Sequence, residues 1–488
     1  MYFVTEEPQI LHQCPGNIGK SAGLCVRQEL RTQDTQLQCR HCRSLAKGSP
    51  APRENVQASD ECGTLKGMRH AARNTGRYVS RLTSGTLAVV MAGGRGERLK
   101  ALTQHRCKPA TPFGGKFRII DFVLSNCVNS GIRQIAVLTQ YKAQSLIQHI
   151  QRGWSYLRGE LGEFVELIPA QQQIGTHWYR GTADSVYQNL DFIRSHHPTH
   201  VLILAGDHIY KMDYGPMIAY HEQCEADITV GVVDVPLERA NEFGIMTTDD
   251  TNRVTKFAEK PQDPDPIIGQ ENLARASMGI YVIGMDRLEK MLTDDAANES
   301  SNHDFGRNII PPALARLRVF AYPFHDVETR AQNYWRDVGN VDALYEANME
   351  LVSLNPELNI YDHQWPIWTY QAQQPPAKFV LDEEGRRGMA VNSMVAGGCI
   401  ISGAYVKESL LSNDVRIEDS SSIESSVLLP SVTIGRRCKI TRCILDEGCM
   451  IPDDTEIGKD HAVDRQRFFV TKRGVVLVTQ DMLRAGAR

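Results

Sequence analysis

The sequence has no long apolar segment and little net charge, and each absence excludes a class of protein. No apolar run approaches the roughly 18–20 residues that a helix needs to cross a membrane, so no membrane-spanning segment is expected. The formal net charge of −4 gives no bulk electrostatic attraction to nucleic acid. The first residues carry the acidic pair Glu6 and Glu7 where a signal peptide would carry positive charge. We therefore expect a cytoplasmic protein.

Residues 1–80 lack the periodic apolar pattern of a folded segment. They are polar and rich in Gln, Arg and Ser, which predicts a disordered N-terminal extension in which Met68 is a plausible native start. Four of the 12 cysteines lie there: Cys14, Cys25, Cys39 and Cys42. They suit either a zinc site or a set of free thiols, because their spacing is irregular for zinc and disulfides are unusual in a reducing compartment.

A glycine-rich loop follows a short apolar run, and together they predict a phosphate site. Leu87–Met91 is too short for a helix and is typical of a buried strand. Gly93–Gly96 follows it, and glycines let backbone N–H groups approach a phosphate closely. The loop lacks the Gly-Lys-Ser/Thr ending of a P-loop and the third glycine of a dinucleotide fingerprint. The pattern GGxGxRL, with Cys-Lys-Pro beginning nine residues after Arg98, instead resembles the sugar-phosphate nucleotidyltransferases.

Between residues 85 and 360, expected strands alternate with expected helices. The expected strands are Ala88–Met91, Ile135–Thr139, Val201–Leu204, Ile228–Val233 and Ile280–Ile283. The clearest helical patterns are Ala143–Arg152 and Ala183–Ser195. This alternation predicts an α/β fold, a Rossmann-like domain whose mostly parallel sheet binds ligands at the carboxyl ends of its strands.

Beyond a Pro-rich linker, expected at 361–390, the spacing of apolar and small residues changes. They recur every six positions, with one phase shift, at Cys399, Tyr405, Leu411, Ile417, Ile423, Leu429, Val432, Cys438, Ile444 and Met450. This period predicts a parallel β-helix with a C-terminal tail over 391–488, and an antiparallel β-domain with accidental spacing is the alternative. Hexapeptide-repeat acyltransferases share such coils but generally need a histidine base, and residues 391–460 contain no histidine.

Two aspartates are candidates for holding a metal ion. Asp207 follows the expected strand Val201–Leu204, so it lies at the ligand edge of the sheet, where it could hold Mg²⁺ against phosphate oxygens. Asp337 could supply a second carboxylate, since Mg²⁺ usually takes one or two. The alternative for Asp207 is a turn-capping role, which is common after strands.

Two further motifs are candidates for a sugar-phosphate site. Lys260 could pair with a phosphate while Glu259 accepts hydrogen bonds from sugar hydroxyls, although an adjacent Glu and Lys can also be a solvated surface pair. Tyr179 precedes Thr182, which can cap a helix whose N-terminus favours a phosphate or polar ligand. The alternative for this second motif is an aromatic contact on a loop.

Eight motifs carry a resemblance to one family. In chain order they are AGGRGxRL, KPAxxFGGKFRIIDFxLSNCxNSGI, WYRGTAD, LAGDHIYKMDY, EKP, SMGIYV, HDFGxxIIP and YWRDVG. With this set, from about residue 85 to 485, the chain resembles the bacterial glucose-1-phosphate adenylyltransferases, or ADP-glucose pyrophosphorylases. FGGKFRIIDF and WYRGTAD argue against relatives that make UDP-, dTDP- or GDP-sugars, and a panel of nucleotides would test that alternative.

The resemblance implies a reaction, a fold and a set of site residues. ATP and α-D-glucose 1-phosphate would give ADP-glucose and pyrophosphate for glycogen biosynthesis, on a nucleotidyltransferase domain followed by a left-handed parallel β-helix, in a homotetramer. The residues implied to act on the nucleotide and its phosphates are Gly93, Gly94, Gly96, Arg98 and Lys108. Those implied to hold glucose 1-phosphate are Tyr179, Gly244, Glu259, Lys260 and Ser277. Asp207 and Asp337 are the implied Mg²⁺ ligands, and Arg98, Lys108 and Asp207 the implied catalytic residues.

Two details qualify this expectation. Glu97 stands where many relatives have Thr or Ser, and a carboxylate near a triphosphate is repulsive unless it points away or meets a metal ion. A regulatory subunit with a decayed active site is a non-enzymatic alternative. Decay should remove charged groups first, yet the charged residues named above are all present.

Relatives bind anionic metabolite effectors between the catalytic domain and the β-helix, and basic residues there are candidates here. These are His105, Arg106, Arg118, Arg436, Arg437, Arg442 and Arg484, and any of them could instead be a solvated surface residue. His105 stands where an activator-binding Lys is expected, and Glu447 where an AMP-binding Arg is expected. We therefore expect regulation by an anionic sugar or organic phosphate, with weak inhibition by AMP.

Overall fold

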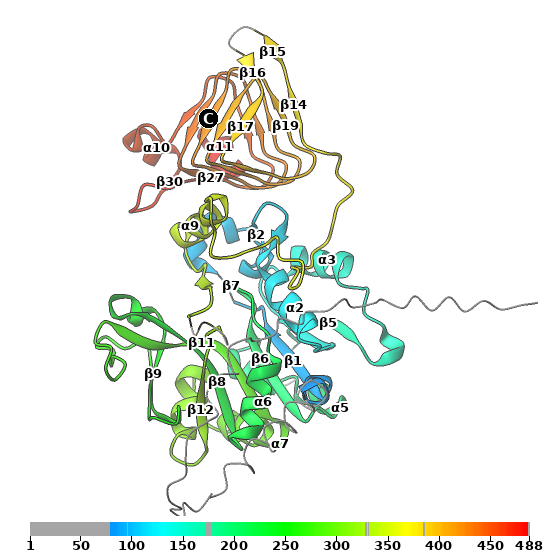
Figure 1. Ribbon diagram of the computed structural model, residues 1–488, viewed down its shortest axis with the longest axis vertical. Helices are drawn as coiled ribbons and strands as arrows, with labels where there is room; N and C mark the ends of the chain where they lie inside the picture. Colours follow the sequence, from blue (N-terminus) through cyan, green and yellow to red (C-terminus); the bar gives the residue numbers. More distant parts are fainter. Residues whose placement is uncertain are drawn as a thin grey trace, which may run out of the picture. The chain divides into compact units, whose positions relative to one another are not determined.

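A computed structural model describes residues 79–486, apart from 95, 172–176, 327–328, 330 and 384–385 (Figure 1). The predictions for residues 1–78, namely disorder, a possible zinc site and a start at Met68, lie outside the described residues. Most of the described residues belong to one of two structures. The first is a large, mostly parallel sheet with helices, and the second is a stack of short strands.

In the described part of the chain, the large sheet has nine strands, and seven of them run in one direction. Its strands are β1 (Thr86–Met91), β4 (Gln134–Thr139), β5 (Phe164–Pro169), β6 (His200–Ala205), β8 (Ile228–Pro236), β9 (Gly244–Thr248), β10 (Val254–Glu259), β11 (Leu273–Gly284) and β12 (Val319–Pro323). Strands β10 and β11 run the other way. Each of the five strands predicted from apolar runs lies in this sheet, so the mostly parallel α/β fold is confirmed.

Helices cover both faces of this sheet, which explains why β1 is apolar throughout. Ala88 and Val90 pack into one core and Leu87 and Val89 into the other, as the two-residue period of a strand requires. The first core takes side chains from α2 (Ile119–Asn129), α3 (Gln144–Gly153) and α6 (Gly215–Gln223). The second takes them from α4 (Thr182–Tyr187), α5 (Leu190–Ser195), α7 (Met285–Ala296) and α8 (Ile310–Ala313).

The predicted single helix Ala183–Ser195 is wrong in one respect, because the structure breaks it into α4 and α5. The break falls at Asn189, whose side-chain amide donates 2.7 Å to the carbonyl of Ser185 and 2.9 Å to the hydroxyl of Tyr179. An Asn side chain that bonds to a nearby carbonyl competes with the helix for its backbone partners. The break therefore links the helix to a residue of the predicted site.

Short helices and two small pairs of strands lie in the connections between the strands and helices of this domain. They are the 3-10 helices η1 (Glu97–Thr103), η2 (Lys108–Ala110), η3 (Gly159–Leu161) and η4 (Leu237–Glu242), the π-turn η5 (Phe305–Ile309), the pair β2 (Pro112–Phe113) and β3 (Phe117–Arg118), and the pair β7 (His208–Tyr210) and β13 (Trp335–Asp337). Helix α9 (Val341–Val352) follows β13.

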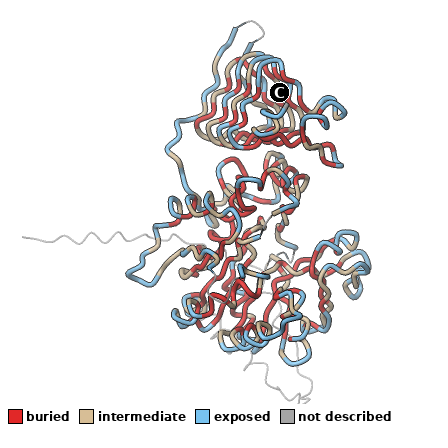
Figure 2. Tube along the Cα trace, turned by 180° about the vertical axis from the view of Figure 1, so that it is seen from behind, coloured by how far each residue is buried: buried red, intermediate tan, exposed pale blue. Residues whose placement is uncertain are grey.

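The C-terminal part consists of coils that stack through three sheets, parallel except where β30 adds antiparallel to β31, with an inner core of buried residues (Figure 2). The first sheet comprises β14 (Lys378–Val380), β19 (Ile400–Ser402), β22 (Arg416–Ile417), β25 (Thr433–Ile434) and β28 (Met450–Ile451). The second comprises β17 (Met389–Val391), β20 (Tyr405–Lys407), β23 (Ser422–Glu424), β26 (Lys439–Thr441) and β29 (Glu456–Ile457). The third comprises β18 (Met394–Val395), β21 (Leu410–Leu411), β24 (Val427–Leu428), β27 (Cys443–Leu445), β31 (Val476–Val478) and β30 (Phe469–Val470).

The stack is consistent with the left-handed parallel β-helix that the sequence predicts, and the antiparallel alternative is wrong. Its register explains where the six-residue spacing fails. Tyr405 pairs with Ser422 and Ser422 with Lys439, so a coil contains 17 residues and a strict count of six drifts by one position per coil. Tyr405 and Met450, both expected inside, are accordingly 39% and 64% exposed.

Backbone geometry at the corners maintains this register. Ser420, Arg437 and Asp454 lie 17 residues apart and all have positive φ, at 62°, 54° and 59°. Each therefore turns the chain at the same place in successive coils, in a conformation that costs a non-glycine residue energy. The coil is set by its corners as well as by its apolar interior.

The predicted linker region contacts both parts of the molecule. Trp368 N donates 2.8 Å to Ser125 Oγ of α2, and Thr369 Oγ1 donates 2.7 Å to Asp121 Oδ2 of the same helix. Strand β14, also within 361–390, pairs with β19 of the first full coil. The division into domains at 85–360, 361–390 and 391–488 stays a prediction.

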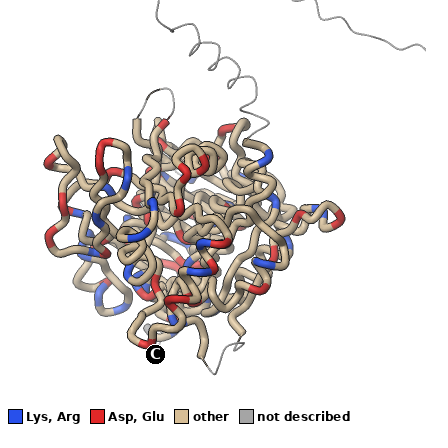
Figure 3. Tube along the Cα trace, turned by 90° about the horizontal axis from the view of Figure 1, so that it is seen from below, with Lys and Arg blue, Asp and Glu red and all other residues tan. Residues whose placement is uncertain are grey.

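Helix α9 joins the two parts through a shared core. Tyr345 and Leu344 of α9 pack with Leu410, Val427 and Ile444 of the coils. Two short helices, α10 (His461–Arg467) and α11 (Gln480–Gly486), are the last helices in the described part of the chain. No helix among the described residues has the length and apolar character to cross a membrane. Along the chain trace in Figure 3, the positions of Lys and Arg are interspersed with those of Asp and Glu.

Candidate active site

A cavity of about 740 Å³ lies at the carboxyl ends of the parallel strands, where the predicted nucleotide loop follows β1. Gly93, Gly94 and Gly96 all line it. Gly96 has a φ of 64°, and a Cβ there would lie 3.0 Å from Thr103 Cγ2 and 3.2 Å from Lys108 Cβ. Glycine is therefore required for the loop to turn against Lys108.

Lys108 is the centre of a charged cluster in this cavity. Its Nζ lies 2.9 Å from Asp207 Oδ2 and 2.8 Å from Asp337 Oδ1, and its side chain is only 6% exposed. Burial disfavours the ammonium, but the two carboxylates outweigh it and raise the pKa of Lys108. Burial also opposes ionisation of Asp207, yet Lys108 and then His208 hold its pKa well below the usual range. Arg98 Nη2 completes the cluster at 3.5 Å from Asp337 Oδ2.

Strand pairing explains how two aspartates so distant in sequence meet. Asp207 directly precedes β7, and in the pairing of β7 with β13 residue Asp337 lies opposite His208. Ligand atoms of Asp207, His208 and Asp337 all lie within 4.8 Å of one another. Carboxylate oxygens are the ligands that Mg²⁺ prefers, so the two aspartates fit a divalent ion.

His208 is a residue of this cluster that the sequence reasoning missed. Its Nε2 lies 3.5 Å from Asp207 Oδ1 and 4.0 Å from Asp337 Oδ1, and its ring packs edge-on against Trp335. The available signal was its place directly after Asp207, on the first residue of β7.

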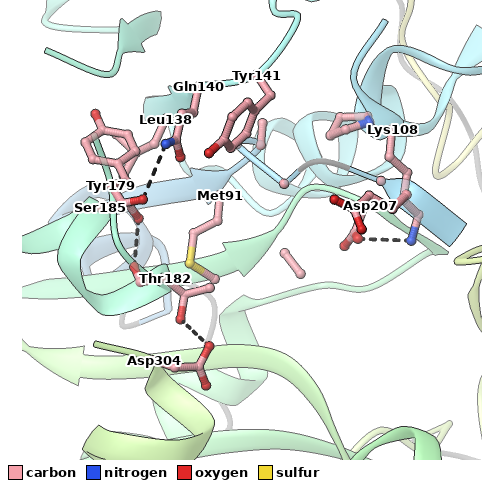
Figure 4. A pocket seen from close by; sticks show the side chains of 18 of the residues that line it. Met91, Lys108, Leu138, Gln140, Tyr141, Tyr179, Thr182, Ser185, Asp207 and Asp304 are labelled. Carbon is pink, nitrogen blue, oxygen red and sulfur yellow. Dashed lines mark hydrogen bonds and ion pairs between the residues drawn. The ribbon is translucent and has the colours of Figure 1, made fainter. Parts of the chain in front are cut away.

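The opposite wall of the cavity holds Tyr179, Thr182 and Asp304 (Figure 4). Thr182 Oγ1 donates 3.1 Å to Asp304 Oδ2 and accepts from the Phe305 backbone N–H at 3.0 Å. The chains approach closely here, since a Cβ on Gly181 would lie 2.2 Å from the His303 carbonyl oxygen. The predicted capping role of Thr182 is thus replaced by a side-chain link between two segments.

Asp304 and Gln140 are further lining residues that sequence reasoning did not select. Asp304 accepts hydrogen bonds from the backbone N–H groups of Gly306 and Arg307, which fixes its carboxylate at the start of η5. Gln140 directly follows β4 and donates 3.3 Å to the Tyr179 carbonyl. Asp304 lies within the HDFG motif and Gln140 at a strand end, and both positions were available as signals.

Of the residues expected to hold glucose 1-phosphate, Gly244, Glu259 and Ser277 lie on β9, β10 and β11, and Lys260 directly follows β10. Gly244 opens β9 and pairs with Glu259 at the end of β10, and Lys260 Nζ lies 3.7 Å from Glu259 Oε1. Burial, with Asp304 nearby, raises the pKa of Glu259. Ser277 of β11 makes a side-chain hydrogen bond with Tyr281, which is electrostatically coupled to Asp304 and Glu259. Of the predicted sugar-phosphate residues, Tyr179 alone lines the 740 Å³ cavity in the described structure.

The predicted effector residues are mostly paired with acids of the same chain. Arg106 Nη2 lies 3.1 Å from Asp446 Oδ1 and 3.6 Å from Glu447 Oε2, and His105 Nε2 lies 2.9 Å from Asp481 Oδ2. Arg437 pairs with Asp454 at 2.6 Å.

Other predicted effector residues differ in their surroundings. Arg442 lies over the ring of Tyr345, and Arg436 and Arg484 carry no ion pair among the described residues. Arg118 donates to the Ala110 carbonyl, and burial lowers its pKa although Glu447 opposes this. Arg118 and Glu447 line one cavity of about 180 Å³ at the edge of the coils.

Comparison with known proteins agrees with this geometry. Residues 87–353 match the Nucleotidyl transferase family, and residues 375–478 match the family of GlmU-like C-terminal hexapeptide regions. The fold, the matching families and the cavity with its glycine loop thus define a nucleotidyltransferase with a hexapeptide β-helix.

Similar curated proteins narrow this class. The glucose-1-phosphate adenylyltransferase of Methylococcus capsulatus is 58% identical, over 85% of this chain and 98% of its own length. That of Nitrosococcus oceani is 60% identical, over 83% and 96%, and that of Dechloromonas aromatica 57%, over 84% and 94%. The chain belongs to the glucose-1-phosphate adenylyltransferase family. Nucleotidyltransferases of this family generally need a divalent metal ion.

Proposed function

We propose that this protein transfers the adenylyl group of ATP to α-D-glucose 1-phosphate, giving ADP-glucose and pyrophosphate. The observation that carries the proposal is the single cavity in which a glycine loop, a buried Lys108 and two carboxylates face Tyr179 and Asp304. The backbone N–H groups of a glycine loop suit a triphosphate, and the acidic wall suits sugar hydroxyls. The membership of the family supports the choice of substrates.

The proposed chemistry needs no side-chain nucleophile. A phosphate oxygen of glucose 1-phosphate attacks the α-phosphorus of ATP. The bond between that phosphorus and the oxygen that bridges the α- and β-phosphates breaks, which releases pyrophosphate. Such transfers are accelerated mainly by positioning and by cations that stabilise the spreading charge. Lys108 and Arg98 are the cations placed to do this, and Gly93, Gly94 and Gly96 position the nucleotide.

Mg²⁺ is the proposed metal ion, and Asp207 and Asp337 are the residues that would hold it. When bound, it would neutralise phosphate charge and orient the triphosphate. Asp207 is suited to this role because its depressed pKa keeps it ionised well below neutral pH. Lys108 keeps the two carboxylates at a fixed separation, since it bonds to both.

The sugar-phosphate side of the proposal involves Glu259, Lys260, Gly244, Ser277 and Tyr179. Lys260 is 51% exposed and pairs only loosely with Glu259, so its ammonium is available to a phosphate. Glu259 is more buried and can accept hydrogen bonds from hydroxyl groups. These roles rest on the resemblance and on the closeness of the residues to Asp304.

Regulation by an anionic metabolite, a homotetrameric assembly and a cytoplasmic location complete the proposal, and they rest on the resemblance. Arg118 is the predicted effector residue that lines a cavity, whereas Arg106 and His105 contact acids of the chain. Glu447 beside Arg118 would repel a phosphate, so we expect AMP to inhibit weakly. Glu447→Arg should lower the AMP concentration for half-inhibition about tenfold or more.

The direct test measures pyrophosphate release from glucose 1-phosphate with ATP, UTP, dTTP or GTP, each with and without Mg²⁺. Turnover with ATP at least tenfold above the other nucleotides, and dependent on Mg²⁺, is expected. A preference for UTP or dTTP would support a different nucleotide-sugar product. No turnover with any nucleotide, in a protein of normal melting temperature, would favour the regulatory-subunit alternative.

A further inference from the structure

A buried histidine, His303, directly precedes Asp304 of the catalytic cavity but does not itself line that cavity. Only 2% of its surface is exposed. Its ring Nδ1 donates 2.7 Å to Oδ2 of Asp295, a residue of α7 whose side chain is 8% exposed. Burying such polar groups costs free energy unless they are paired, so the ring and the carboxylate hold each other in place.

Asp295 holds the chain before His303 as well as its ring. Ser301 Oγ donates 2.6 Å to Asp295 Oδ1 and accepts 2.9 Å from the His303 backbone N–H. Both carboxylate oxygens of Asp295 are therefore bonded to the segment 301–303. Helix α7 is a firm support for these contacts, because its two leucines are buried in the second core of the sheet.

The backbone of His303 contacts a different element, the start of α4. Its carbonyl accepts 2.8 Å from the Ala183 N–H, and the close approach of Gly181 leaves no room for a side chain there. Its φ of 52° is rare for a residue with a side chain, although histidine adopts such values more readily than most residues. One residue thus contacts α7 through its ring and α4 through its carbonyl, in a backbone conformation that is typical of functional sites.

Asp304 is the residue that these contacts place in the cavity. Its Oδ1 accepts from the N–H groups of Gly306 and Arg307, and its Oδ2 accepts 3.1 Å from Thr182 Oγ1 (Figure 4). An ionised carboxylate offers about four lone pairs, two on each oxygen, so Oδ2 keeps one acceptor position for a ligand. A hexose hydroxyl is a suitable donor for that position.

We propose that His303 is a positioning residue for the sugar side of the catalytic cavity. Its hydrogen bond to Asp295 holds Asp304 Oδ2 where that oxygen accepts a hydrogen bond from a hexose hydroxyl. This role rests on the proposed function, in which the hexose is glucose 1-phosphate. Hydrogen bonds weaken steeply with poor distance and angle, so a loosened 303–305 segment would lose the contact although every residue that touches substrate is unchanged.

The effect of His303 should be confined to the sugar. Within the described residues, its hydrogen bonds and ion pair go to Ser301, Asp295 and the start of α4, and none goes to the glycine loop or to Lys108. The affinity for glucose 1-phosphate and the affinity for ATP should therefore respond differently to a change at His303.

Steady-state pyrophosphate release tests this with two variants that break the pair from opposite ends. His303→Ala and Asp295→Ala should each raise KM for glucose 1-phosphate about fivefold or more, with kcat and KM for ATP within about twofold, because they weaken sugar binding in the ground and transition states alike. Asp294→Ala is the matched control, since Asp294 is exposed on the same helix and lines the same cavity of about 400 Å³ as Asp295. It should change none of these constants, and melting temperatures verify that all variants are folded.

His303→Asn distinguishes the hydrogen bond from the bulk of the ring. Asparagine tolerates positive φ, and its Nδ2 occupies the same place in the side chain as Nδ1 of histidine, so it can still donate to Asp295. This variant should keep KM for glucose 1-phosphate within about twofold of the unaltered protein. A rise as large as in His303→Ala, or an equal rise in KM for ATP in the alanine variants, would overturn the proposal.

A change at Asp304 separates positioning from a general structural role. If His303 acts through Asp304, His303→Ala should raise KM for glucose 1-phosphate less than about twofold when Asp304→Asn is already present. The same fold-rise in both backgrounds would overturn the proposal. Unchanged KM in His303→Ala, in a protein that turns over normally, would contradict the positioning role alone, whereas no turnover by the unaltered protein would contradict the proposed function.

Discussion

Arg106 and Lys108 lie two positions apart in the chain, yet they belong to different regions of the molecule. Lys108 lies between Asp207 and Asp337 at the catalytic cavity, and Arg106 between Asp446 and Glu447 against the β-helix. Both side chains are nearly buried, at 6% and 10% exposed. The same local arrangement, one cation between two carboxylates, thus occurs at two places.

The carboxylates differ in how they respond to their surroundings. Lys108 and His208 outweigh burial at Asp207 and lower its pKa, whereas burial outweighs Arg106 at Asp446 and raises its pKa. Asp207 lines the cavity of about 740 Å³, whereas Asp446 lines neither this cavity nor the one of about 180 Å³ beside Arg118. A charged cluster that opens on a ligand-sized hollow is a candidate for chemistry, and one that is enclosed joins two parts of the fold.

The largest expected effect is on catalysis at the first cluster. Asp207→Asn should lower kcat by about a hundredfold or more, because removing a metal ligand weakens stabilisation of the transition state. Steady-state pyrophosphate release measures this, and circular dichroism checks the fold. The comparison variant Asp446→Asn should keep kcat within about threefold. Near-normal kcat in Asp207→Asn would make Asp207 a structural turn residue.

At the second cluster the expected loss is in stability. Arg106→Ala leaves Asp446, whose side chain is 11% exposed, without its cation, and should lower the free energy of unfolding by about 3 kcal/mol. Urea denaturation followed by fluorescence measures it. Arg437→Ala is the control, since it breaks an exposed pair with Asp454 that solvent screens, and it should lower the free energy of unfolding far less than Arg106→Ala. Equal losses would mean that the Arg106 pair has no special role between the regions.

A smaller effect is expected beside the cavity, at the predicted sugar-phosphate residues. Lys260→Ala should raise KM for glucose 1-phosphate several-fold and leave KM for ATP nearly unchanged, because it removes binding energy common to the ground and transition states. Lys256→Ala, on β10 four residues before Lys260 and paired with Asp265, is the matched control and should change neither constant. An equal rise in KM for ATP would contradict the assignment.

The smallest expected effect is on the pH dependence of stability. Its sign should differ between the Lys108 cluster, which contains Asp207, and the Arg106 cluster, which contains Asp446. The pKa of Asp446 is raised in the folded protein, so its contribution to stability increases as pH falls and is lost as pH rises through that pKa. The pKa of Asp207 is lowered, so its contribution is present above the unfolded pKa and is lost as pH falls below about 4.

Melting temperatures from pH 7 to pH 3 measure these signs. The difference between the unaltered protein and Asp446→Asn should move in favour of the unaltered protein on acidification. The melting temperature of the unaltered protein should fall relative to that of Asp207→Asn on acidification, and only below about pH 4. The same sign for both variants would show that the two clusters do not differ in this way.

The sequence by itself determined the elements whose signal is local. Leu87–Met91 is a strand because every residue is apolar and the run is too short to form a buried helix. Gly96 has a positive φ, which glycine adopts without strain. The period near six predicted parallel coils for the same reason, since each coil repeats one local pattern. The failures at Tyr405 and Met450 arose because the true repeat of 17 is fixed by the corners, whose conformations involve Ser420 and its equivalents.

Only the tertiary structure decided which charges meet. Lys108 and Asp337 are 229 residues apart in sequence, and the pairing of β7 with β13 brings Asp337 beside Asp207. Nothing local distinguishes Lys108 from Arg106, and their different partners follow from which segment packs against each of them. The sequence states which side chains carry charge. Their electrostatic environment depends on the charges and burial contributed by distant segments, and only the folded chain brings these together.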